Sequence, residues 1–273
     1  MRLTLGEVSF ELREPFDLSF LEESGEPFEV FDQQDSGNIC FALRKGEEKR
    51  FVKLAGAATV RGSVTPEEAV RRMRACSAVW RDLDHPALLR LIEDKPVPGG
   101  YMQVFEYGEG RCMSPMYGDH ERFMALPFQE KLGIYETVLR FHEHVSGRGY
   151  VAIDFYDGCI LYDFESRQTR LCDVEFYRRA PVVNDMGRMW GSSRFMSPEE
   201  LILGAVIDER SNVFTMGQTA FQLFGGGMDH ALEKWNAPEA LHAVALKAVS
   251  ERREDRYATI AAYRAAWEEG CRP

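Results

Sequence analysis

The sequence predicts an α+β protein in which an N-terminal part made of antiparallel strands precedes a mainly helical C-terminal part. Apolar and polar residues alternate in short runs over residues 1–54, which is the period of strands with one buried face. From residue 128 onward, apolar residues recur every three or four positions, which is the spacing of helices. We therefore expect two regions, 1–107 and 108–273.

The N-terminal region predicts strands around one helix. Leu3 to Leu12 alternate as a hairpin that turns at Gly6 and Glu7, and three more strands follow in the runs PFEVFDQ, NICFALRK and KRFVKLAG. A helix should begin after Thr65, because Thr-Pro-Glu-Glu supplies an N-cap, a first-turn proline and the Glu of a capping box. It should end before Pro86. The runs ALLRLIED and GYMQVFEYG predict two further strands, joined by a PVPGG turn.

The C-terminal region predicts helices separated by short strands and one long irregular stretch, 175–194. A capping box at Ser197-Pro198-Glu199-Glu200 should open a helical region after that stretch. The other expected elements are a helix from 128 to 147, strands in CILYDF and TRLCDV, a helix over 213–223, and helices over 240–249 and 259–268.

Composition narrows the class of protein. The chain has 273 residues with 33 Lys and Arg against 44 Asp and Glu, a net charge of −11, which argues against a general binder of nucleic acid or anionic membranes. No apolar run approaches the roughly 20 residues of a membrane span, and the N-terminus lacks the apolar core of a signal peptide. The six cysteines show no CxxC spacing, so we expect reduced thiols in a cytoplasmic protein.

Four chemistry-bearing residues stand out by their order along the chain. Lys53 ends a predicted strand in FVK, and Asp154 lies in a loop in IDFYDGCIL. Asp173 follows a strand in LCDVE, 19 residues after Asp154, and Glu199 lies 26 residues further on, in GSSRFMSPEE. Each motif is weak alone, and the order and spacing of the set carry the signal.

This order resembles the protein kinase superfamily, in the form of a divergent member of the eukaryotic-like Ser/Thr protein kinases of bacteria. FVK is similar to the strand that carries the ATP-anchoring lysine, and VFEYGEG to the hinge that holds adenine. IDFYDGCIL is similar to the catalytic loop, CDVE to the metal-binding DFG, and GSSRFMSPEE to the segment ending in APE. The resemblance implies a bilobal fold with an antiparallel-sheet N-lobe and a helical C-lobe.

The resemblance also implies phosphoryl transfer with ATP and Mg²⁺ as cofactors and a protein as substrate or signalling partner. Lys53 would hold the α/β-phosphates, Asp154 would orient or deprotonate the accepting hydroxyl, and Asp173 would hold Mg²⁺. The lysine and the two acids would converge on one cleft between the lobes. The remaining nucleotide contacts would come from Gly37, Asn38, Glu106 and Gly108, with Asp157 as a second metal ligand.

Several positions depart from the family pattern. The glycine-rich loop has only Gly37, and the small residue expected two positions before Lys53 is Phe51. The helix Glu that pairs with the lysine is missing from its register, and Glu68 is the nearest candidate, about two turns early. The Asn that holds a second metal is Cys159, a poor ligand for Mg²⁺.

Two more family features bear on the helical region. The aspartate of its central helix is replaced by Asn212. The family pairs Glu199 with Arg256 as a structural ion pair, although Pro-Glu-Glu also fits any helix start. As an alternative, Asp154 and Asp157 could simply stabilise a tight turn, and a strand-end lysine taken alone is commonly a solvated one.

Three functions stay open on the sequence alone. The first is an active Ser/Thr protein kinase, favoured by the retention of Lys53, Asp154 and Asp173. The second is a pseudokinase that serves as a scaffold or a nucleotide-binding module without catalysis, favoured by Phe51 and Cys159. The third is a phosphotransferase for a small metabolite on the same fold.

Overall fold

The computed structural model describes residues 1–33 and 35–272; Gln34, in the DQQDSG stretch, and Pro273 lie outside the described residues. The expectation of an α+β protein with antiparallel sheets is confirmed. The chain forms two compact units. Unit 1 comprises residues 1–84 and 89–108, and unit 2 comprises residues 85–88 and 109–273.

Unit 1 contains a five-stranded antiparallel sheet in the order β3-β4-β5-β7-β6. Its strands are β3 (Glu26–Phe31), β4 (Asn38–Lys45), β5 (Glu48–Ala55), β6 (Leu91–Val97) and β7 (Gly100–Glu106). The other elements of unit 1 are the hairpin of β1 (Arg2–Leu5) and β2 (Val8–Glu11), the 3-10 turn η1 (Ser19–Glu23) and the helix α1 (Pro66–Asp82). The hairpin turns at Gly6 and Glu7, as the alternation predicted.

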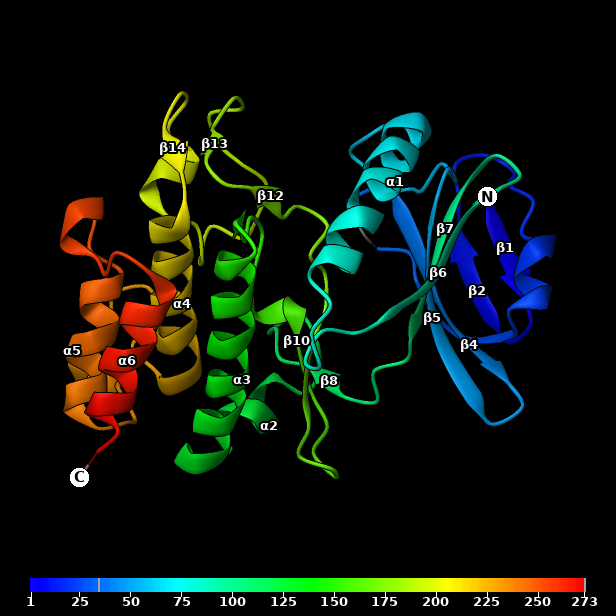
Figure 1. Ribbon diagram of the computed structural model, residues 1–273. Helices are drawn as coiled ribbons and strands as arrows, with labels where there is room; N and C mark the ends of the chain where they lie inside the picture. The colour runs from blue at the N-terminus through cyan, green and yellow to red at the C-terminus, as the bar shows by residue number, and fades with distance from the viewer. Residues whose placement is uncertain (34, 273) are drawn as a thin grey trace. The chain divides into compact units, whose positions relative to one another are not determined.

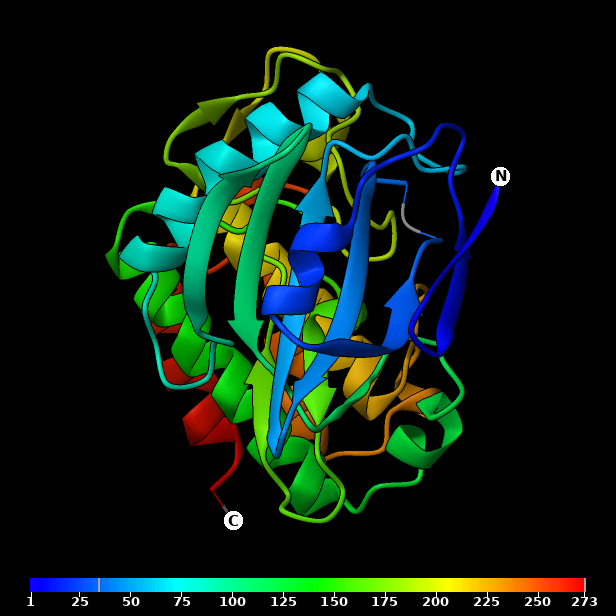
Figure 2. The same ribbon diagram turned by 90° about the vertical axis from the view of Figure 1, so that its right-hand side faces the viewer.

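The two faces of this sheet pack against different elements (Figures 1 and 2). One face carries Phe41, Val52 and Leu54, which form a core cluster with residues of the N-terminal hairpin. The other face contacts α1, where Ala55 and Met73 belong to a second cluster. Because successive residues of a strand point to opposite faces, residues 51, 53 and 55 share the α1 face.

The helix α1 begins as predicted, with Thr65 as its N-cap. The Thr65 hydroxyl accepts a hydrogen bond from the Glu68 backbone N–H at 3.3 Å. The Glu68 carboxylate does not close a capping box. It pairs instead with Arg71 and Arg72, one turn further along the helix.

The strand predicted over ALLRLIED is misplaced by about four residues. Residues 86 and 87 form a turn, and β6 runs from Leu91 to Val97, so that Pro96 and Val97 belong to the strand while Pro98 and Gly99 form the turn. Pro96 is compatible with this strand because β6 is an edge of the sheet, where one side of the backbone needs no ladder hydrogen bond.

Unit 2 is built mainly of helices. The helices α3, α4, α5 and α6 contact one another and lie side by side in Figure 1. The helices and 3-10 turns are α2 (His120–Met124), α3 (Phe128–Gly147), η2 (Asp157–Cys159), η3 (Pro198–Leu201), α4 (Glu209–Phe224), η4 (Leu232–Lys234), α5 (Glu239–Ala248), η5 (Arg253–Asp255) and α6 (Ile260–Gly270). Its short antiparallel strands are β8 (Arg111–Cys112), β9 (Tyr150–Val151), β10 (Ile160–Tyr162), β11 (Thr169–Leu171), β12 (Arg178–Arg179), β13 (Val182–Val183) and β14 (Val206–Ile207).

Residues 85–88 belong to unit 2 although they follow α1 directly. The Leu171 backbone N–H donates to the Ala87 carbonyl at 2.7 Å, and Leu88 forms a parallel bridge with Leu171. This segment therefore pairs with the end of β11, two residues before Asp173.

The helical region predicted after Ser197 is a single 3-10 turn. The capping box of Ser197 and Glu200 is present, but η3 ends at Leu201 because Ile202 is extended. The helix that follows begins earlier than the apolar spacing indicated, at Glu209, where Asp208 supplies an unanticipated N-cap. Among the described residues, no helix combines the length and apolar character needed to cross a membrane.

Candidate active site

The segment that leads into Asp154 is fixed by a buried amide on α4. The Asn212 side chain is 2% exposed. Its Oδ1 accepts from the Ala152 backbone N–H at 2.8 Å, while its Nδ2 donates to the Tyr150 carbonyl and to the Ser146 hydroxyl, both at 3.0 Å. The amide thus satisfies both a donor and an acceptor of the backbone just before Asp154. Asn212 makes these contacts with a side-chain amide, whereas the resemblance predicts an aspartate carboxylate at this position.

Asp154 and Asp173 share an uncommon backbone conformation. Their φ angles are +65° and +63°, in the left-handed region where Asp is tolerated better than most residues. Gly191 lies against Asp154, because a Cβ added there would meet the Asp154 Cα and Oδ1 at 3.4 Å. Two acids held in this region at loop positions are typical of functional sites.

Cys159 connects the backbone at Asp154 with the backbone next to Asp173. The Cys159 Sγ donates to the Asp154 carbonyl oxygen at 3.7 Å, and the Cys159 carbonyl accepts from the Cys172 N–H at 3.0 Å, one residue before Asp173. Burial raises the pKa of the Cys159 thiol well above its usual value, and the charges of Asp173 and Asp154 add to that rise. The structure therefore brings Asp154 and Asp173 to one place, around a thiol that stays neutral.

Asp157 is engaged elsewhere. Both of its carboxylate oxygens accept hydrogen bonds from the Arg194 guanidinium, at 2.6 and 2.8 Å. The Asp157 side chain is 1% exposed, and that of Arg194 is 30% exposed. A bidentate pair of this kind leaves Asp157 as an anchor for the 191–197 segment, and the structure lends no support to it as a metal ligand.

The side chains around Asp154 and Asp173 could hold Mg²⁺ only together with the phosphates of a bound nucleotide. Among residues 1–33 and 35–272, no group of three or more His, Cys, Asp and Glu side chains is placed to hold a metal ion by itself. Mg²⁺ in nucleotide enzymes is bound by one or two carboxylates together with substrate phosphates, so a complete protein cage is not required. Asp173 can serve in that way, whereas the Cys159 thiol is a poor ligand for so hard a cation.

Lys53 lies in unit 1, on β5, in register with Cys40 of β4 and Gln103 of β7. Two residues earlier, the half-buried Phe51 ring packs against the Phe31 ring of β3 with centroids 5.7 Å apart. The Glu68 carboxylate, the candidate partner for the lysine, is occupied by arginines of its own helix. The face of β5 that carries Lys53 therefore also carries the Phe51 ring, at the position where the resemblance predicts a small side chain.

Gly37 and Asn38 lie where β4 begins. Gly37 has φ +82°, and a Cβ there would come within 2.8 Å of the Val64 side chain, so packing requires glycine at this position. Asn38 is fully buried, and its backbone N–H donates to the Ser36 hydroxyl at 3.4 Å. The single glycine of this loop is thus explained by a close contact within unit 1.

Glu106 and Gly108 lie at the end of β7. The Glu106 backbone N–H donates to the Arg90 carbonyl at 3.0 Å, and its carboxylate accepts from the Arg90 N–H at 2.9 Å. Both groups of Glu106 are therefore used inside unit 1. Gly108, two residues beyond β7, is the last residue of unit 1.

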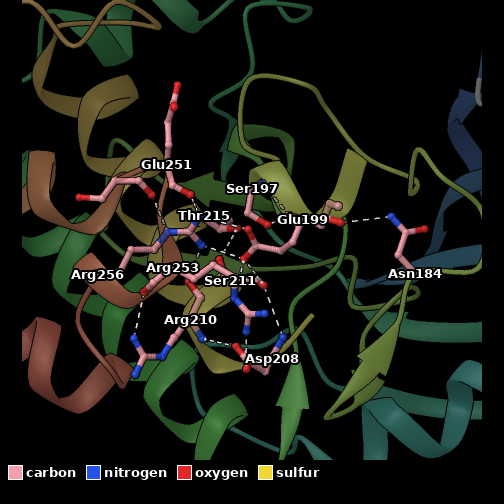
Figure 3. A network of polar contacts seen from close by, with 12 residues as sticks. Asn184, Ser197, Glu199, Asp208, Arg210, Ser211, Thr215, Glu251, Arg253 and Arg256 are labelled. Carbon is pink, nitrogen blue, oxygen red and sulfur yellow. Dashed lines mark hydrogen bonds and ion pairs between the residues drawn. The ribbon is translucent and has the colours of Figure 1, made fainter. Parts of the chain in front are cut away.

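The ion pair of Glu199 with Arg256, expected from the resemblance, is confirmed (Figure 3). The Arg256 guanidinium donates to both Glu199 oxygens at 2.7 and 3.1 Å, and the Ser211 hydroxyl donates to the same carboxylate at 2.6 Å. These contacts lower the pKa of Glu199, although its burial acts in the opposite direction and is the largest single cause. The pair fastens η3 to α4 and to the C-terminal helices of unit 2.

Sequence reasoning missed two residues of this region. Arg194 lies in the irregular stretch, where an arginine fits a phosphate, an acidic substrate or solvent, and nothing in the sequence indicates its partner 37 residues earlier. Tyr156 belongs to no motif, because an aromatic residue in a loop has no chemical signature in the sequence. Its position between Asp154 and Gly158 was the available signal.

Comparisons with known proteins leave the family open. No protein-family model matches the chain, and no curated protein matches it.

Proposed function

We propose that this chain is a divergent member of the kinase-like superfamily, with a bilobal fold, and that it transfers the γ-phosphoryl group of ATP to a Ser or Thr hydroxyl of a protein. The observation that carries the proposal is the meeting of Asp154 and Asp173, both in left-handed backbone, around Cys159. The clamp of Asn212 on the preceding backbone supports it, because phosphoryl transfer depends on rigidly positioned charges.

Each retained residue has a role in this reaction. Asp154 accepts the proton of the attacking hydroxyl or orients that hydroxyl toward the phosphorus atom. Asp173 holds Mg²⁺, which when bound neutralises charge on the phosphate oxygens. Lys53 binds the α/β-phosphates as a point charge. The proposal requires these three side chains to reach the same nucleotide.

A pseudokinase scaffold is the second candidate, and the contact of Phe51 with Phe31 favours it. In the family, the residue at the position of Phe51 is small because adenine lies against it. An aromatic pair at this position would narrow or fill the adenine pocket. The replacement of a metal-binding amide by Cys159 points the same way.

The experiment is a transfer assay with radiolabelled ATP and Mg²⁺, using the full chain with a basic and an acidic protein as acceptors. Label should appear in protein with the wild type and should fall at least a hundredfold with Asp154→Asn, which keeps the shape and removes the base. Label transferred only to small alcohols or amino sugars would favour a metabolite phosphotransferase. An absence of transfer to any acceptor would favour the scaffold.

A further inference from the structure

The helix α1 packs against β7 within unit 1 (Figure 1). Residues 101, 103 and 105 of β7 point to the same face of the sheet, because successive side chains of a strand alternate. The Arg74 guanidinium lies over the Tyr101 ring, 5.2 Å from its centroid. The Trp80 and Phe105 ring centroids are 4.6 Å apart. Gln103 lies between these two contacts and therefore faces the middle of the helix.

The Gln103 side chain is bound to one turn of α1. Its amide nitrogen donates to the Ser77 hydroxyl at 2.9 Å and to the Met73 carbonyl oxygen at 3.2 Å. The same nitrogen lies 3.3 Å from the Cys76 Sγ. A backbone carbonyl can only accept, so the contact with Met73 fixes which end of the amide faces the helix. Gln103 is 1% exposed and Ser77 is 2% exposed, so water does not compete for these hydrogen bonds.

Packing alone does not explain an amide at position 103. Burying an amide costs free energy unless it is hydrogen-bonded, and a methionine would fill the same space without that cost. The amide adds direction, because its hydrogen bonds form at one rotation and one height of the helix. A buried polar network that is satisfied specifies a single arrangement. Gln103 therefore fixes where α1 lies on the sheet.

The same row of the sheet carries Lys53. Lys53 on β5 lies directly opposite Gln103 on β7, and such residues share a face, with Cβ atoms about 5 Å apart. In the kinases that the sequence resembles, a glutamate of this helix pairs with the lysine and connects helix to sheet. Residues 73–77 are Met, Arg, Ala, Cys and Ser, so the turn that Gln103 contacts offers no carboxylate. An amide next to Lys53 makes the connection to this turn.

We infer that Gln103 is a positioning residue, whose amide holds α1 on the sheet beside Lys53 in place of an ion pair between that lysine and a helix glutamate. The inference rests on the proposed function and concerns its regulation. In kinases with the ion pair, control of activity acts through the position of this helix. The hydrogen bonds of Gln103 are neutral and buried, and they need no charge on Lys53. The position of α1 is therefore independent of the lysine.

Hydrogen exchange of the α1 backbone amides, measured on the full chain without nucleotide, tests this role. Gln103→Met keeps the length of the side chain and removes its hydrogen bonds, so exchange over residues 73–80 should become about tenfold faster. Lys53→Met should leave the same amides at the wild-type rate. Unchanged exchange in Gln103→Met, or an equal increase in Lys53→Met, would overturn the inference.

If Gln103→Met does not fold, Ser77→Ala supplies the same test. It removes the partner of Gln103 at 2.9 Å, and alanine has a higher helix propensity than serine. Faster exchange in Ser77→Ala is therefore not an effect of propensity and supports the role of Gln103. Exchange that is unchanged or slower would overturn it.

A binding readout separates positioning from stability. Because α1 borders Lys53, Gln103→Met should weaken the binding of ATP with Mg²⁺ about tenfold and leave adenosine, which has no phosphates, at its wild-type affinity. This loss should vanish in the Lys53→Met background. Glu68→Gln is the matched control and should bind ATP as the wild type does, since the Glu68 carboxylate pairs with Arg71 and Arg72.

Equal losses of ATP and adenosine affinity in Gln103→Met would show general damage to the fold and would overturn the positioning role. A wild type that binds neither ligand would refute the proposed function. The exchange experiment contains no nucleotide, so in that case it still decides whether Gln103 or Lys53 holds α1.

Discussion

Both oxygens of the Asp157 carboxylate accept hydrogen bonds from the Arg194 guanidinium, at 2.6 and 2.8 Å, and the carboxylate is almost completely buried. The pair joins the loop that carries Asp154 to the segment that carries Gly191, which itself lies against Asp154. It ties the two segments of unit 2 that flank the candidate site.

Removing Arg194 alone should destabilise unit 2. Arg194→Gln leaves the buried Asp157 charge unpaired, and since the arginine is partly exposed we expect a loss of about 2–3 kcal/mol, measured by denaturant unfolding. The double variant of Asp157→Asn with Arg194→Gln removes both charges and should recover part of that loss. If Arg194→Gln is as stable as the double variant, the unpaired Asp157 charge does not destabilise unit 2 and the prediction is wrong.

Asn212 should be needed for both stability and activity. Asn212→Ala removes three hydrogen bonds from a buried site, so we expect a loss of about 2–4 kcal/mol and a fall in kcat as the backbone before Asp154 loosens. Asn212→Asp keeps the acceptor for the Ala152 N–H but loses both donors, and it should be intermediate in unfolding and transfer assays. If Asn212→Ala has wild-type stability, the hydrogen bonds of Asn212 to the backbone before Asp154 do not hold that segment in place.

Glu200 should make stability depend on pH. It is 4% exposed, and burial raises its pKa from 4.5 to about 7 despite hydrogen bonds from the Ser197 N–H and hydroxyl. Between these two pKa values the folded chain holds a proton that the unfolded chain has lost. Stability therefore falls as pH rises from about 4.5 to about 7, by about 3 kcal/mol, and changes no further above that.

The measurement is chemical unfolding of the wild type and Glu200→Gln at several pH values from 5 to 8. The glutamine variant keeps an acceptor for Ser197 but cannot titrate, so it should gain stability relative to the wild type as pH rises. The exposed Glu233→Gln serves as the control and should run parallel to the wild type. Parallel curves for all three chains would contradict the role of Glu200.

Much of the local structure follows from pattern. The alternation at Leu3 to Leu12 and the cap at Thr65 predicted their elements, because a hairpin and a helix start depend on residues close in sequence. The turn predicted at Pro96 was wrong because a proline usually indicates the end of a strand. An edge strand tolerates proline, and the sequence does not show that β6 is an edge strand. The longer helical region predicted after Ser197 was wrong because a capping box indicates where a helix begins and not how long it is.

The candidate site was only partly predictable. The meeting of Asp154 with Asp173 followed from the order of motifs. The pairing of Asp157 with Arg194 did not, because a loop carboxylate fits a metal and an arginine equally well until its distant partner is placed. The contact of Tyr156 with Gly158 is local in sequence, but no pattern distinguishes it from an ordinary turn.

The most direct test of the central claim, that Asp154 and Asp173 belong to a site for magnesium and ATP, is the thermal unfolding of the full chain with and without ATP and Mg²⁺. A ligand present at one hundred times its Kd adds about 2.7 kcal/mol to the folded state. We predict a rise in Tm for the wild type that requires Mg²⁺, and no Mg²⁺-dependent rise for Asp173→Ala. A wild-type Tm unchanged by millimolar ATP with Mg²⁺, or an equal rise in Asp173→Ala, would contradict the claim.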